Sequence, residues 1–205
     1  ACLVGSEMCI RDRIETVSTG DRTDTIGTLI QSLRLAETSS WAWWQQDVAF
    51  HASDGSDALD SLRLNPLTLL PIGERRHNRR GFSRIIYDGP HVHGVLDSAA
   101  TFTAIDTTFA VAPFASAEVD AVIRAQPLDS GFVTRLPVYY PGKIGFVWMT
   151  VRVVGVDSSE YIVESTATPG TDRYWISRST RELLAVQDNG DPAHAYSFKR
   201  PTTKP

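Results

Sequence analysis

Short runs of strand-forming residues, separated by turn residues, constrain the fold of this chain more than any other feature. The strongest run, 143–154, is apolar on both faces, with Val147 and Met149 on one side and Phe146 and Trp148 on the other. The other predicted strands are 28–36, 41–51, 61–64, 68–72, 81–87, 91–96, 102–111, 131–140, 160–166, 173–177, 182–187 and 194–199. Ten or so of these runs are expected to form antiparallel strands in meander order, as in all-β barrels.

One short helix interrupts the strands, at about 116–126. Ser116 is the expected N-cap, and Glu118 stands in the first turn, where the helix dipole favours negative charge. Val119, Val122 and Ile123 follow the helical apolar spacing. The predicted fold class is mainly β, an antiparallel meander forming a curved sheet or incomplete barrel with this single helix.

Charge and length exclude several classes of protein. The net charge is −4, with 20 basic and 24 acidic residues, which argues against a nucleic-acid partner. The cationic cluster Glu74–Arg80 is interpreted as a solvated hairpin. No apolar run in the visible chain approaches the ~20 residues of a membrane-spanning helix. We expect one β domain over 14–199 and a disordered tail over 200–205.

Residues 1–13 are interpreted as a segment that does not belong to the native protein. Cys2 and Cys9 fit neither a zinc site nor a redox pair, because their spacing is too wide and no histidine lies nearby. Residues 2–13 resemble the translation of a transposon adaptor used in DNA sequencing. We therefore treat 1–13 as non-native, as fusion scars should be. The native chain is expected to lack cysteine and to begin upstream of Ile14, so any signal segment would be out of view.

Five segments in order carry a family resemblance. They are 61–72, Tyr87-Asp88-Gly89, 124–132, 151–155 and 174–184. Together they resemble uncharacterised exported bacterial β-proteins of a domain-of-unknown-function type, over roughly residues 45–190. Such proteins are similar in architecture to outer-membrane lipoprotein carriers, whose open barrel and helical plug hold acyl chains. The resemblance implies export to the periplasm or the outer membrane, with no known enzymatic activity or cofactor.

Aromatic side chains are the candidate ligand-binding residues. Trp41 and Trp43 share one face of their predicted strand, and Trp44 points the other way. With Phe146, Trp148 and Trp175, Trp41 and Trp43 could line an apolar cavity. Packing in a solid core is the alternative interpretation.

A metal site formed by polar residues has weaker support than an apolar ligand site. His91 and His93 lie on one strand face at a chelating spacing, and His77, Asp88 and Asp97 could add ligands only if hairpins bring them close. Solvent-facing strand residues explain the pair without a metal, and no metal site is predicted.

The triplet Asp129-Ser130-Gly131 matches that of aspartic proteases. Phe132 replaces the small residue which those enzymes need, and a plain turn explains the triplet. The sequence therefore identifies no catalytic residue.

The functional expectation is a non-enzymatic envelope protein that binds a hydrophobic ligand or a lipidated partner in a half-barrel. Two alternatives stay open at this point. One is a structural or interaction module without a cavity, and the other is a metal-dependent enzyme using His91 and His93.

Overall fold

The computed structural model describes residues 9–19, 22–79, 81–98, 101–142, 144–167, 170–191 and 194–199. In this part of the chain, fifteen strands form one continuous sheet in the order β8-β7-β6-β5-β4-β3-β2-β1-β15-β14-β13-β12-β11-β10-β9. The strands are β1 (Cys9–Thr19), β2 (Arg22–Glu37), β3 (Ala42–Ala52), β4 (Asp57–Leu64), β5 (Pro71–Asn78), β6 (Gly81–Asp88), β7 (His91–Ser98), β8 (Thr101–Thr108), β9 (Phe114–Ala115), β10 (Val133–Tyr140), β11 (Gly145–Val156), β12 (Glu160–Ala167), β13 (Gly170–Ser177), β14 (Leu183–Asp191) and β15 (His194–Lys199). The predicted fold class is confirmed.

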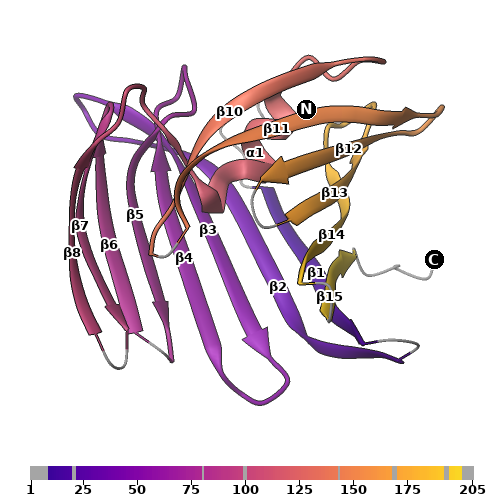
Figure 1. The fold of residues 1–205 in the computed structure, drawn as a ribbon, viewed down its shortest axis with the longest axis horizontal. Helices are drawn as coiled ribbons and strands as arrows, with labels where there is room; N and C mark the ends of the chain where they lie inside the picture. Colours follow the sequence, from indigo (N-terminus) through magenta and orange to yellow (C-terminus); the bar gives the residue numbers. More distant parts are fainter. Residues whose placement is uncertain are drawn as a thin grey trace.

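Two meanders make up the sheet. β1 to β8 form an N-terminal arm and β10 to β15 form a C-terminal arm, and β1 pairs with β15 where the arms join. Among the described pairings, β9 with β10 is the only parallel one. The sheet curls, so that the two arms face each other and enclose the helix α1 (Figure 1). The molecule is therefore a half-barrel with a helix inside it.

The helix forms as the apolar spacing predicts. A 3-10 turn, η1 (Ser116–Glu118), leads into α1 (Val119–Ala125). Val119, Val122 and Ile123 are buried. Ser116 is not the N-cap: the Glu118 carboxylate instead accepts a hydrogen bond from the Ala115 amide at 2.7 Å. A buried carboxylate thus replaces the expected hydroxyl cap.

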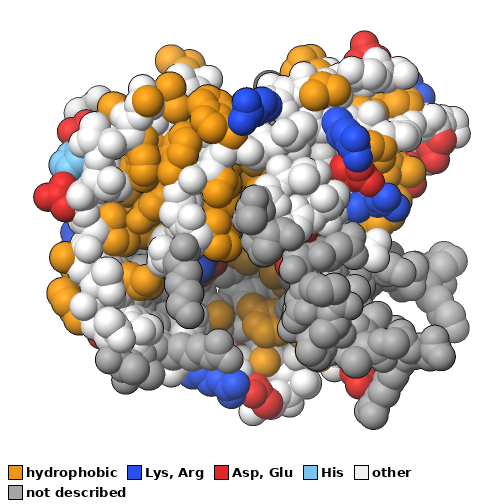
Figure 2. All heavy atoms as spheres, viewed as in Figure 1, with side chains coloured by type: hydrophobic (Ala, Val, Ile, Leu, Met, Phe, Trp, Pro, Cys, Tyr) orange, Lys and Arg blue, Asp and Glu red, His pale blue; other side chains and the backbone are white. Residues whose placement is uncertain are grey.

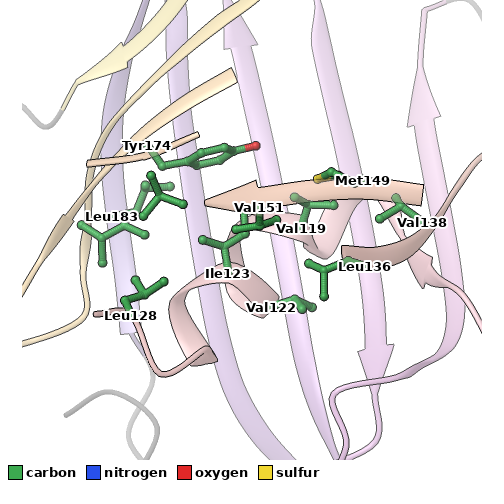
Figure 3. Packing of buried hydrophobic residues seen from close by; sticks show 12 residues of the cluster. Val119, Val122, Ile123, Leu128, Leu136, Val138, Met149, Val151, Tyr174 and Leu183 are labelled. Carbon is green, nitrogen blue, oxygen red and sulfur yellow. The ribbon is translucent and has the colours of Figure 1, made fainter. Parts of the chain in front are cut away.

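Two apolar clusters hold the half-barrel together. The first packs α1 against the inner face of the C-terminal arm, where Val138, Met149 and Val151 meet Val122 and Ile123 (Figure 3). The second covers the inner face of the N-terminal arm and comprises Leu33, Trp44, Leu62, Leu64, Ile85, Tyr87, Val92, Ala115 and Tyr139. Because Ala115 and Tyr139 come from β9 and β10, the second cluster fastens the two arms to each other.

Some predicted boundaries differ from the structure. The 68–72 strand is wrong: Asn65 Oδ1 accepts hydrogen bonds from the amides of Leu67 and Thr68, at 2.9 and 3.1 Å, and makes a turn there. β5 begins only at Pro71 and includes most of the cationic cluster. The predicted solvated hairpin is therefore limited to the turn after Asn78, which pairs with Gly81.

Two dipeptides that favour a hairpin turn, Asp88-Gly89 and Asn189-Gly190, do not form the turn by themselves. Asp88 pairs with His91, so the first turn lies at Gly89-Pro90, one residue after the dipeptide begins. β14 continues past Asn189 and Gly190, where its pairing with β15 is irregular, to Asp191, which pairs with His194. In both cases the strand continues into the dipeptide that favours a turn.

The N-terminal segment gives a further difference. Cys9–Arg13 pair with β2 as part of β1, although a non-native segment over residues 1–13 was expected to be loose. Cys2, the side chain of Cys9 and the tail 200–205 lie outside the described residues, so the expectations about them stay predictions. The strand β1 was missed because 14–27 shows no regular alternation of apolar residues.

One glycine in the N-terminal arm is required by close packing between strands. Gly94 in β7 has φ +152°, and a Cβ at this position would overlap the carbonyl oxygen of Arg84 in β6. Gly94→Ala is therefore expected to lower the free energy of unfolding by about 1–3 kcal/mol, as strained backbone does. Chemical denaturation measures this change. Gly73→Ala is the control and should shift stability by less than about 0.5 kcal/mol, because its Cβ would meet no atom closer than 3.5 Å.

Candidate functional site

A cavity of about 180 Å³ lies beside the start of α1, inside the half-barrel. Residues from three regions line it: Leu29, Gln31 and Val48 from β2 and β3, Ser116, Ala117, Val119 and Asp120 from η1 and α1, and Tyr174, Leu183 and Val186 from β13 and β14. Figure 2 shows the molecule hollowed at its centre, over β2 and β3, with hydrophobic side chains at the bottom of the hollow. Both arms and the helix therefore contribute to one apolar site.

Strand periodicity explains why these side chains point inward. Leu29 and Gln31 alternate along β2 with residues on the outer face, and they share the inner face with buried Leu33. Val48 faces the same side because it pairs with Gln31 across β2 and β3. The alternation along β2 thus places Leu29 on the inner face, where it lines a cavity because the sheet curls.

A polar link holds the helix over the cavity. Gln31 Nε2 donates a hydrogen bond of 3.1 Å to Asp120 Oδ2, and these two residues lie 89 positions apart. Arg124 pairs with the same carboxylate oxygen at 3.4 Å, one helical turn later. This link joins α1 to the N-terminal arm, while its apolar face packs on the C-terminal arm.

The far wall of the cavity includes Tyr174. Burial raises the pKa of its hydroxyl group, with a smaller effect from Asp172, so the side chain stays neutral. The Ser165 hydroxyl donates to the Tyr174 hydroxyl at 3.5 Å. Tyr174 therefore contributes mainly a ring face to the cavity, next to Leu183 and Val186.

A second group of polar side chains is sealed in the core between η1 and the N-terminal arm. Glu74 and Glu118 are 1% and 0% exposed, and burial raises the pKa of both carboxyl groups. Tyr87 donates a hydrogen bond of 3.0 Å to Glu74, and Gln46 donates one of 3.0 Å to the Ala117 carbonyl. The sequence does not reveal this group, because a buried acid within a charged run looks the same as a solvated one.

Three oxygens in this group have no hydrogen-bond partner among the described residues. They are Gln46 Oε1, Glu118 Oε2 and Glu74 Oε1, and the last of these forms an ion pair of 3.7 Å with Arg76. Buried acceptors without a hydrogen-bond donor are costly, and a proton on one carboxyl group would turn an acceptor into a donor. The group therefore favours a protonated glutamic acid in the folded state.

The five aromatic residues predicted to bind a ligand do not line the cavity. Trp41 and Trp43 lie 5.2 Å apart between ring centroids. The outer face of the N-terminal arm carries Trp43, because its neighbour Trp44 is buried on the inner face. A ligand-binding role for these tryptophans stays a prediction.

The other three lie on the C-terminal arm. Phe146 stacks on Phe109 with centroids 4.9 Å apart, and Trp148 packs edge-on to Phe146 at 5.9 Å. Trp148 on β11 is 45% exposed. Trp175 is half-buried on β13, which is two strands away in the sheet. The structure thus brings Phe146 and Trp148 together and separates them from Trp41 and Trp43.

The histidine pair lies on the outer face of β7. The His91 and His93 rings stack with centroids 5.0 Å apart, and His91 Nε2 lies 2.8 Å from Asp106 Oδ1. This hydrogen bond is the largest cause of the lowered pKa of Asp106. In the described part of the chain, no three His, Cys, Asp or Glu side chains lie close enough together to hold a metal ion.

The aspartic-protease triplet is a turn. The Ser130 amide donates to Asp129 Oδ1 at 2.9 Å, and Gly131 takes a positive φ of 80°. The Phe132 amide closes the turn on the Asp129 carbonyl at 3.1 Å. This is the arrangement that the alternative interpretation of the triplet predicted.

These features define an open antiparallel β half-barrel whose helix and two arms surround an apolar cavity. The chain belongs to the protein family of unknown function DUF3108, whose profile matches residues 15–191. No curated protein matches the chain. Among the described residues, no helix is long and apolar enough to cross a membrane.

Proposed function

We propose that this protein is a non-catalytic carrier or receptor which holds an apolar chain, from a lipid or a lipidated protein, in its half-barrel. The observation that carries this proposal is the cavity between α1 and both arms, which is lined by Leu29, Val48 and Leu183 among others. A cavity lined by apolar side chains favours an apolar ligand.

The size of the cavity limits what it would hold. Its volume of about 180 Å³ is below the roughly 300–1,000 Å³ of sites for drug-sized ligands. We infer that the cavity receives the end of a chain, and that the rest extends into the central hollow. Gln31 and Asp120 would then stand at the polar end of the contact, where their mutual hydrogen bond is already satisfied.

A larger side chain that fills the cavity should weaken ligand binding. Val48→Trp would place a large ring in the cavity, and we expect the affinity for a dansyl-labelled fatty acid to fall by about tenfold or more, since shape mismatch removes buried contact area. Fluorescence titration measures the affinity. Ala49→Trp is the matched control, because Ala49 lies on the opposite face of the same strand.

The control should bind the probe within about twofold of the wild type. Mass spectrometry of the purified protein is a second measurement, and it should find co-purified lipid. A wild-type protein that neither carries lipid nor binds the probe would contradict the proposal, and would favour a structural or interaction module with a solid core.

We also propose that the protein works in the cell envelope, in the periplasm or at the outer membrane. The resemblance to exported β-proteins supports this location. Sequencing the coding DNA upstream of Ile14 tests it, because a signal peptide or a lipid-anchoring cysteine would be read directly. A cytosolic fusion partner in that position would contradict the proposal.

A further inference from the structure

The outer face of the N-terminal arm carries a second hollow, on the opposite side of the sheet from the apolar cavity. It has a volume of about 280 Å³ and spreads over β3 to β6. Gly73 creates it: this residue pairs with Arg63 in β4 and with Ile86 in β6, and has no side chain to fill the space between them. The hollow is thus a defined depression in a face that is otherwise covered by side chains.

Three arginines line the hollow. Arg75 lies directly opposite Arg84 across β5 and β6, and Arg63 stands on β4 beside Gly73. Like charges directly opposite each other in a sheet are unfavourable unless something neutralises them. Among the described residues, none of these three guanidinium groups forms an ion pair with a carboxylate.

The described groups beside these arginines do not neutralise them. Arg63 lies over the ring of Trp43, with the guanidinium carbon 5.5 Å from the centroid, which orients it without cancelling its charge. The nearest acid in register, Asp47, accepts hydrogen bonds from Ser61 and Gln45 at 2.6 and 2.9 Å. Glu74 also borders the hollow, but its carboxyl group is buried towards the inner face, where Tyr87 donates a hydrogen bond to it.

We propose that this hollow is a binding site for a phosphate group, either on a small phosphorylated molecule or on a phospholipid headgroup. Guanidinium groups match phosphate oxygens with paired, charge-assisted hydrogen bonds. Three positive charges around one hollow suit a multiply charged anion better than a single carboxylate. The net charge of the chain is −4, so the chain as a whole does not attract anions, and the local cluster of arginines would have to supply the attraction.

The test is a titration with inorganic phosphate at low ionic strength, measured by isothermal titration calorimetry. We expect saturable binding by the wild type. Arg75→Gln with Arg84→Gln should weaken it at least tenfold. Gly73→Val should weaken it similarly, because this change fills the hollow and keeps all three arginines.

The matched control is Arg135→Gln with Arg178→Gln, which removes the same charge from the C-terminal arm. It should change the affinity less than twofold. No saturable binding by the wild type, equal loss in the control, or full binding by the Gly73→Val variant would each overturn the proposal. Circular dichroism of every variant separates loss of binding from loss of fold.

Vesicles distinguish the two sources of phosphate. Sedimentation with phosphatidylcholine vesicles, with and without phosphatidic acid, shows whether the site accepts a headgroup at a membrane surface. Binding that requires phosphatidic acid and is competed by inorganic phosphate assigns the site to a headgroup. Binding of inorganic phosphate without binding to vesicles assigns it to a free molecule. Vesicle binding unaffected by the Arg75 and Arg84 changes would overturn the proposal.

Discussion

Leu62→Ala is expected to lower the free energy of unfolding by about 2–5 kcal/mol, as truncation of a fully buried leucine does. Leu62 is 0% exposed and lies at the centre of the inner face of the N-terminal arm, among Trp44, Leu64 and Ile85. Removing its isobutyl group leaves a void that the rigid strands around it cannot close. The same cluster fastens β9 and β10 to this arm, so the loss should reach the whole fold.

Leu59→Ala is the matched control for this prediction. Leu59 belongs to the same strand, β4, but its side chain is 48% exposed on the outer face. Its truncation should cost less than about 0.5 kcal/mol. Equilibrium denaturation with urea gives both values. Equal losses for the two variants would contradict the assignment of the inner and outer faces.

The second large effect concerns Glu118 and the pH. Burial raises the pKa of Glu118 well above its usual value, with a further contribution from Glu74. The folded state therefore holds a proton that the unfolded state has released. The contribution of Glu118 to the free energy of unfolding is fully present below the usual carboxyl pKa of 4.5. This contribution is lost as the pH rises from there towards the raised pKa of the folded state.

Glu118→Gln should remove most of this decline. The glutamine amide keeps an oxygen to accept from the Ala115 amide and cannot ionise. At pH 8 we expect the variant to be more stable than the wild type by about 1–3 kcal/mol, the range for an uncompensated buried polar group. Thermal unfolding across the pH range from 4 to 9 measures the difference. A wild type whose stability rises over this range, with the variant following in parallel, would contradict the prediction.

Glu164→Gln provides a control of opposite sign. Hydrogen bonds from Arg173 and Arg152 hold the pKa of Glu164 below its usual value. Its contribution to stability is therefore present above pH 4.5 and is lost as the pH falls further. Glu164→Gln should lower stability at neutral pH by roughly 0.5–1 kcal/mol, since both arginines are partly exposed, and should have little effect in acid.

A buried pair of carboxyl groups beside the helix start has a consequence for the proposed function. Glu118 caps the turn that carries Ser116 and Ala117, two residues of the cavity wall. Ionisation of Glu118 would weaken the packing of η1 before it affects the strands. Ligand affinity should therefore fall with rising pH in the wild type and vary less in the Glu118→Gln variant.

The sequence by itself determined the local structure. Alternation along β11 and β3 is a property of neighbouring residues, so the faces of Trp43 and Trp44 and the helix face of Val122 and Ile123 were predictable. Strand ends were less predictable, because a strand can continue past a turn-favouring dipeptide such as Asn189-Gly190 through an irregularity in its pairing.

Tertiary structure alone decided the sites. The curl of the sheet brings Val48 and Leu183 to one cavity, although they lie far apart in the chain. It also buries Glu74, whose neighbours Arg75 and Arg76 make it look solvated in the sequence. The two meanders become one half-barrel through the pairing of β1 with β15, two strands far apart in the sequence whose contact no local pattern encodes.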